Sequence, residues 1–227
     1  MRSALIWAAG LVGGGLLLAT VAASAVYFTG PEAYDGFFGE RDPERSRQAA
    51  TLLHAGVASA ALLVGALQLV LVGRIRLWLH RLLGLVYVGA VMLSVTGAAL
   101  ILPFALGGPV GIAGFLLLAV FWLVSTTLGL LAAMSRDREE HRAWMMRSYA
   151  LTLAGVSLRL QLVLLTGVGG LSFDAVYVVT AWSSWVPNLI VCELLIAALR
   201  RPGADEVSDA EPPPVPHAPT TETGRPG

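Results

Sequence analysis

A few polar and ionisable side chains interrupt the long apolar stretches of this 227-residue sequence, and packing alone does not explain them. They are His54, Gln68, Arg159, Gln161, Asn188 and Glu193, with His80 and His141 at the ends of two stretches. Imidazoles ligate metals or haem iron and carry protons, a guanidinium holds anions, and a carboxyl can relay protons. Ionisable groups are costly in an apolar segment, so each one is a candidate for a functional site.

The composition indicates that a membrane surrounds these residues. Hydrophobic residues make up 56% of the chain and charged residues 13%, whereas soluble domains have about 25% charged residues. Six apolar stretches reach the ~20 residues that a transmembrane helix needs. They are residues 4–28, 49–72, 82–106, 111–134, 145–166 and 176–199. We therefore expect an all-α fold: a polytopic transmembrane bundle of six spans over residues 1–199, with a disordered proline-rich tail over residues 200–227.

The positions of the arginines predict the orientation. All 15 basic residues are arginine and the net charge is zero, which gives no indication of nucleic-acid binding. The N-terminus, the second and fourth loops and the tail carry 11 arginines, and the first loop carries three among several acids. By the positive-inside rule both termini, and with them the tail, are cytoplasmic. Only Arg159, inside the fifth span, has no part in setting the orientation.

The first apolar stretch has an alternative interpretation as a cleaved signal peptide, with Ala23-Ser24-Ala25 as the cleavage site. Its length of about 25 residues exceeds a typical signal-peptide core and favours a retained helix.

Helical spacing places the polar residues on three helix faces. The faces are His54, Ala58, Ala61, Gly65 and Gln68 in the second span; His80, Gly84, Tyr87, Val91, Ser94 and Ala98 in the third; and His141, Met145, Ser148, Thr152, Gly155 and Arg159 in the fifth. The small residues are explained by close helix packing, but His54 is not. The fifth-span face predicts one continuous stripe of five turns.

Depth along the helices predicts two polar layers: an outer one with His54, Arg159 and Gln161, and an inner one with His80, His141, Gln68 and Glu193. Each residue also has a structural interpretation. The two inner histidines can contact lipid headgroups, and Arg159 can extend to the outer surface or hold an anion. Glu193 with Asn188 forms either a proton-relay element or simply a carboxyl that is kept neutral and hydrogen-bonded near the membrane edge. Pro187 predicts a kink in the sixth span that frees a backbone carbonyl.

Two motifs carry a resemblance to a known family. They are His80-Arg81-x-x-Gly84-x-x-Tyr87 and His141-Arg142-x-Trp144-Met145-x-Arg147-Ser148-Tyr149-Ala150-Leu151, followed by Arg159, Trp185-x-x-Asn188 and Glu193. Over about residues 50–195 the sequence resembles a bacterial family of predicted membrane proteins of unknown function. The resemblance implies a multi-pass protein of the bacterial cytoplasmic (inner) membrane and makes these residues, Ser148 and Tyr149 among them, the ones to test. It implies no activity.

More distantly, the sequence resembles the b-type membrane cytochromes, which hold haem between histidines of neighbouring helices. That resemblance implies a single haem b, or another redox cofactor, with iron between His80 and His141, and leaves His54 as the only other intramembrane histidine for a cofactor site.

The sequence leaves three functions open. The protein is a haem or redox-cofactor protein with a membrane redox partner, a proton-coupled transporter that uses His54, Arg159 and Glu193, or a non-catalytic scaffold. In each case it can also form a homo-oligomer. The single cysteine, Cys192, excludes an intramolecular disulfide framework and a cysteine-based zinc site. Hydrolase, metalloprotease and phosphate-loop motifs do not occur in the sequence.

Overall fold

All the regular structure in the described part of the chain is helical. The computed structural model describes residues 2–26, 46–71 and 73–200, and no strand occurs among them. The helices are α1 (Arg2–Val26), α3 (Ser46–Leu71), α4 (Leu77–Ile101), α5 (Gly108–Met134), α6 (Arg138–Thr152), α7 (Ala154–Leu162), α8 (Phe173–Ser183) and α9 (Val186–Leu199). A 3₁₀ turn, η1 (Leu102–Phe104), extends α4, and a π-helical segment, η2 (Val163–Val168), extends α7. The all-α prediction is confirmed.

Five helical segments are long and apolar enough to cross a bilayer. They are Ala49–Leu71, Leu77–Phe104, Gly108–Met134, Arg138–Val168 and Phe173–Leu199, and they match the second to sixth predicted spans. The fourth segment starts seven residues before the predicted 145–166, because α6 begins with a polar turn capped by Asp137. Helix α1, of 25 residues, occupies the first predicted span. The predicted tail after Arg200 and most of the charged first loop lie outside the described residues.

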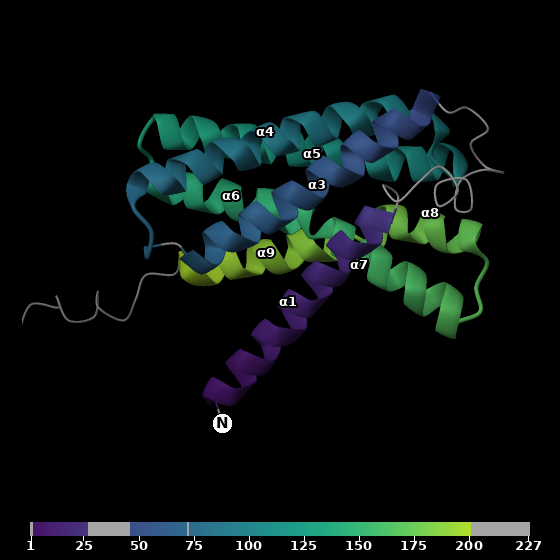
Figure 1. Cartoon of the computed structure of the whole chain (residues 1–227), viewed down its shortest axis with the longest axis horizontal. Helices are drawn as coiled ribbons and strands as arrows, with labels where there is room; N and C mark the ends of the chain where they lie inside the picture. The colour runs from purple at the N-terminus through teal and green to yellow at the C-terminus, as the bar shows by residue number, and fades with distance from the viewer. Residues whose placement is uncertain (1, 27–45, 72, 201–227) are drawn as a thin grey trace, which may run out of the picture.

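The long helices lie side by side along the longest axis of the molecule, and α1 crosses them diagonally (Figure 1). Helix α3 packs on α4, α5 packs on α4 and α6, α9 packs on α6, and α8 packs on α5 and α7. The arginine-containing α3–α4 and α5–α6 connections lie at the end of the bundle where α9 also ends (Figure 1). At that end Arg200 pairs with Glu139 at 3.3 Å and Glu140 at 2.6 Å. This clustering of basic connections at one end is what the positive-inside prediction requires.

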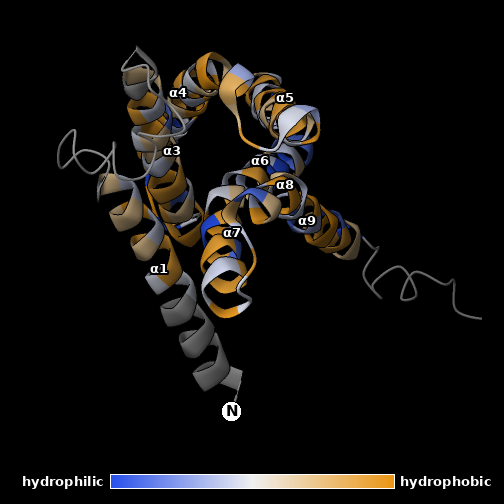
Figure 2. Cartoon of the chain, turned by 90° about the vertical axis from the view of Figure 1, so that its right-hand side faces the viewer, coloured by the Kyte–Doolittle hydropathy of each residue, from blue (hydrophilic) through white to orange (hydrophobic). Residues whose placement is uncertain are grey.

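The outward faces of the helices are apolar, as lipid contact requires. Figure 2 shows hydrophobic residues along most of the bundle. Large side chains such as Leu18, Met134 and Val168 are 65%, 72% and 82% exposed. Soluble proteins rarely expose apolar surface on this scale, so the surrounding solvent is a bilayer.

Small residues let the helices approach closely, as predicted for the second span. A Cβ added at Gly65 of α3 would lie 2.5 Å from the Tyr149 ring of α6. One added at Gly114 of α5 would lie 2.7 Å from the Ala181 carbonyl oxygen of α8. In lipid, van der Waals packing of this kind holds helices together, because no hydrophobic force acts between them.

The fifth and sixth spans are each interrupted near their middles. The fifth-span helix, predicted as five continuous turns, is interrupted at Leu153 between α6 and α7, although Thr152 and Arg159 on the two sides of the interruption still line one space. At this turn the N–H groups of Val156 and Ser157 both bond to the Leu153 carbonyl, at 3.0 Å each. The sixth span breaks between Ser183 and Val186, which confirms the kink predicted from Pro187.

Candidate functional site

His80 and His141 meet at the arginine-rich end of the bundle. They belong to the first turns of α4 and α6, and their ring centroids are 6.5 Å apart with planes at 89°. Nδ1 of His141 lies 2.8 Å from the Gly129 carbonyl oxygen of α5. Since a carbonyl only accepts, this nitrogen donates, and Nε2 of neutral His141 keeps its lone pair. The structure thus brings together the two histidines of the predicted inner layer and fixes the tautomer of one.

The other two residues of the predicted inner layer have different environments. Gln68 of α3 faces α4, where a Cβ at Gly84 would lie 3.7 Å from its Nε2. Glu193 of α9 forms a bidentate pair with Arg147, at 2.6 and 2.9 Å, and its side chain is 52% exposed. The Arg147 guanidinium also lies 4.5 Å from the Trp144 ring centroid. Glu193 therefore belongs to an ion pair at the bundle surface.

A buried hydroxyl cluster lies two turns further into the bundle. The Tyr87 hydroxyl is 2.8 Å from both Ser148 Oγ and Thr152 Oγ1. Thr126 Oγ1 is 2.6 Å from Ser148 Oγ, and Trp122 Nε1 donates to Thr152 Oγ1 at 3.0 Å. This hydroxyl cluster joins α4, α5 and α6 by hydrogen bonds between their side chains.

Tyr149, the next residue after Ser148, lies outside the hydroxyl cluster. Its hydroxyl donates to the Leu62 carbonyl of α3 at 3.2 Å. It therefore ties α6 to α3.

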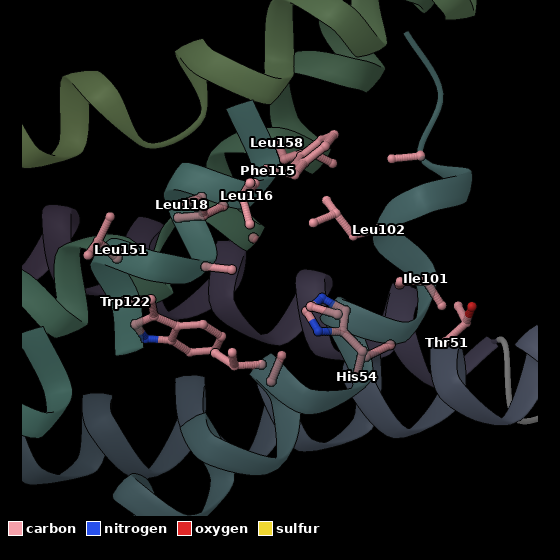
Figure 3. A pocket seen from close by; sticks show the side chains of 18 of the residues that line it. Thr51, His54, Ile101, Leu102, Phe115, Leu116, Leu118, Trp122, Leu151 and Leu158 are labelled. Carbon is pink, nitrogen blue, oxygen red and sulfur yellow. The ribbon is translucent and has the colours of Figure 1, made fainter. Parts of the chain in front are cut away.

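An intramembrane cavity of about 430 Å³ begins where the hydroxyl cluster ends. Trp122 and Thr152 of the cluster line it, together with His54, Arg159 and mostly apolar side chains from α1, α3, α4, η1, α5, α6, α7 and α8. Figure 3 shows His54 and Trp122 on one side of the cavity, opposite Phe115 and Leu158. Two of the three residues of the predicted outer layer thus line one space.

Ser94 of α4 orients the His54 ring. Nδ1 of His54 is 2.9 Å from the Ser94 carbonyl and 3.0 Å from Ser94 Oγ, and this hydroxyl also donates to the His54 carbonyl at 3.3 Å. Nδ1 must donate to a carbonyl, so neutral His54 carries its lone pair on Nε2.

Arg159 of α7 lines the same cavity as His54 and lies beside α1. Its Nη1 donates to the Gly155 carbonyl at 3.0 Å, and its Nη2 donates to Ser24 Oγ of α1 at 2.7 Å. Thr152 and Gly155 of the same predicted face line the cavity together with Arg159, so this face continues past the break at Leu153. The cavity that Arg159 and His54 share does not include Glu193, so the three residues grouped by the transport hypothesis lie in two separate places.

Amide side chains bridge both helix breaks. Asn188 Nδ2 lies 3.2 Å from the Ala150 carbonyl, 3.2 Å from Ser157 Oγ and 3.0 Å from the Ser184 carbonyl. Gln161, the third residue of the predicted outer layer, donates to the Ser183 carbonyl at 3.1 Å and accepts from Ser183 Oγ at 2.6 Å. That carbonyl is the one that Pro187, four residues later, cannot bond. These contacts place both residues in structural roles, and they place Asn188 apart from Glu193.

A family model described as "Predicted membrane protein (DUF2306)" matches residues 51–196. The chain belongs to this family. The match contains every residue of both predicted layers and leaves α1 outside, including Ser24, the partner of Arg159. No curated protein and no solved structure matches the chain. The family description states a membrane protein and names no activity.

Sequence reasoning missed several residues that complete these sites. Trp122 and Thr126 carry no charge and lie in the most apolar span, so only their four-residue spacing marked them as neighbours on one helix face. In the sequence, Ser24 stands out only as part of a possible cleavage site. Hydroxyl groups in apolar helices commonly bond to their own backbone, so these residues gave no distinct functional signal.

Proposed function

We propose that this membrane protein binds one b-type haem, with the iron between His80 and His141. The observation that carries the proposal is the separation of 6.5 Å between the two ring centroids. Imidazole nitrogens bind metals at about 2 Å, so two rings on opposite sides of one iron have centroids about 6 Å apart.

The donor set favours haem over a bare metal ion. Within the described residues, no group of three or more His, Cys, Asp and Glu side chains is placed to hold a metal. A structural zinc site needs four protein ligands and a catalytic one three, whereas a haem brings four nitrogens of its own and needs only axial ligands. Histidines that bind a metal through one ring nitrogen usually donate a hydrogen bond from the other to a carbonyl or carboxylate. His141 has such a bond from Nδ1 to the Gly129 carbonyl, which leaves its Nε2 for the metal.

The surroundings suit a cofactor at the end of the bundle. One turn after His80, Gly84 has no side chain, and the nearest atom to an added Cβ would be Gln68 Nε2 at 3.7 Å. Arg81 and Arg142 directly follow the two histidines and are exposed, and guanidinium groups pair well with carboxylates such as haem propionates, which supports the proposal. A bound haem would supply one-electron redox chemistry, and the protein would supply its axial ligands and the charge around it.

Absorbance spectroscopy tests the proposal. The protein purified from haem-replete cells is expected to show a Soret band and a haem-to-protein ratio near one. His80→Ala and His141→Ala are each expected to lose the band or shift it to that of a haem with one axial histidine. His54→Ala is the matched control, because it removes a histidine that lies in the cavity, and it is expected to keep the spectrum.

Two results would overturn the proposal. One is the absence of Soret absorbance in folded protein, both as purified and after addition of haemin. The other is a Soret band that survives unchanged in both single variants and in the His80→Ala/His141→Ala double variant.

A further inference from the structure

We propose that the intramembrane cavity binds a single-chain amphiphile with an acidic oxygen head group, held by Arg159 and His54, with its hydrocarbon chain among the apolar residues. This site is separate from the histidine pair, and the proposal does not depend on haem binding.

The size and lining of the cavity suit such a ligand. Its volume of about 430 Å³ falls within the ~300–1,000 Å³ of known ligand sites, which are mostly apolar with a few placed polar groups. The apolar part includes Leu102, Phe115, Leu116, Leu118 and Leu158 (Figure 3). Water is poorly held by such surfaces, and a hydrocarbon chain from the surrounding bilayer suits them well.

The polar groups define the head group. Arg159 offers N–H donors and a permanent positive charge, which favours an oxygen anion. His54 offers the lone pair of Nε2, because Ser94 holds its Nδ1 as a donor, so it favours a ligand that donates a hydrogen bond. An acid phosphate monoanion does both, and a carboxylic acid does so by donating its O–H proton to His54 while its carbonyl oxygen accepts from Arg159. An ester or a quinone only accepts, so neither can satisfy His54 in this tautomer.

The depth of Arg159 along its span indicates how the ligand would lie in the cavity. Arg159 lies six residues past the break at Leu153, about 9 Å along the helix, in the half of the span away from the histidine pair. The apolar lining extends from there toward Trp122 and Leu151. A head group at Arg159 and His54 would therefore place its chain along α5, toward the hydroxyl cluster.

Binding of a spin-labelled stearic acid, with the doxyl group near the chain end, tests the proposal in protein reconstituted in nanodiscs of zwitterionic lipid. The acid is expected to give an immobilised EPR component that its methyl ester does not give. Loss of a charged hydrogen bond predicts ~10- to 100-fold weaker binding in Arg159→Gln. Arg147→Gln is the matched control, because it removes an arginine of the same span that pairs with Glu193 outside the cavity, and it is expected to bind normally.

Competition identifies the source of the head group. Displacement of the probe by palmitate alone assigns a fatty acid, and displacement by lysophosphatidic acid alone assigns a phosphate-headed lipid; either result supports the acidic head. A cavity-filling Ala119→Phe variant, with its unfolding midpoint measured alongside, is expected to lose binding of both and tests the site if Arg159→Gln does not fold. The proposal fails if the methyl ester binds as tightly as the acid, or if Ala119→Phe folds and binds the probe normally. It also fails if a neutral quinone displaces the probe equally well from the wild-type protein and from Arg159→Gln.

Discussion

Replacing Gly114 by alanine is predicted to destabilise the bundle at the contact between α5 and α8. The added Cβ would lie 2.7 Å from the Ala181 carbonyl oxygen, 3.0 Å from the Ala181 carbonyl carbon and 2.9 Å from Trp182 Nε1. Two of these are backbone atoms, so no side-chain rotation relieves the overlap. The third belongs to the indole that donates to the Val110 carbonyl at 3.1 Å, and moving it weakens that bond.

The magnitude follows from these contacts. Overpacking a close contact costs ~1–3 kcal/mol, and a weakened hydrogen bond inside a membrane protein adds ~0.6 kcal/mol. Alanine favours a helix over glycine by ~1 kcal/mol, which offsets part of this. Gly89→Ala in α4 has the same intrinsic gain, but its Cβ would have no atom within 4 Å. The free energy of unfolding of Gly114→Ala is therefore expected to be ~1.5–3.5 kcal/mol below that of Gly89→Ala.

Unfolding of the purified protein by sodium dodecyl sulfate in mixed micelles measures this difference. Circular dichroism and tryptophan fluorescence would be followed together, and coincident transitions would support a two-state treatment. Equal midpoints for Gly114→Ala and Gly89→Ala would refute the close approach of α5 to α8, and with it the position of one cavity wall.

Three further variants test contacts elsewhere in the bundle. Tyr87→Phe is expected to lower the free energy of unfolding in the same assay by ~1 kcal/mol, because each hydroxyl partner keeps another hydrogen bond. Gln161→Leu is expected to lower the free energy of unfolding by ~1–2 kcal/mol, because it leaves the Ser183 carbonyl unpaired. The loss is expected to be smaller in a Pro187→Ala background, where residue 187 regains an N–H that can bond to this carbonyl. Equal losses in the two backgrounds would contradict this explanation. Glu193→Gln is expected to change the same free energy by less than ~1 kcal/mol, because exposed ion pairs contribute little, and a larger loss would mean that the pair is more deeply engaged.

Much of the fold was predictable because lipid imposes simple rules. Length and hydropathy predicted the spans, since a helix in a bilayer needs about 20 apolar residues and must satisfy its own backbone. Pro187 predicted the break in the sixth span, because proline removes a donor at a known position. The break at Leu153 was not predicted, because no proline marks it, and Asn188, which bridges it, lies on a distant segment.

The sequence predicted which residues belong to the candidate sites better than it predicted which partners they contact. Charge in an apolar span pointed to His54 and Arg159, and motif spacing pointed to His80 and His141. Depth along the helix did not indicate that Glu193 faces outward toward Arg147, because depth fixes a level and leaves the direction around the helix axis open. The neutral partners Ser24 and Trp122 needed the tertiary structure.

The two helix breaks lie next to each other, since Asn188 bonds to carbonyls or hydroxyls on both sides of the first and to Ser184 at the second. On the side of the breaks that holds the histidine pair, α6 packs on α9, and on the side that holds Arg159, α7 packs on α8. The chain from α7 to α8 is thus a hairpin that leaves the rest of the bundle at two adjacent breaks and packs back on it, through α8 on α5 and α7 on α1. A rotation of this hairpin about the two breaks would widen or narrow the cavity without opening any turn of either half-helix, and it would require α8 to slide on α5 at Gly114. The rate at which a lipid-borne molecule exchanges with the cavity would then depend on the amide bonds of Asn188, which lies far from the head group that holds the molecule.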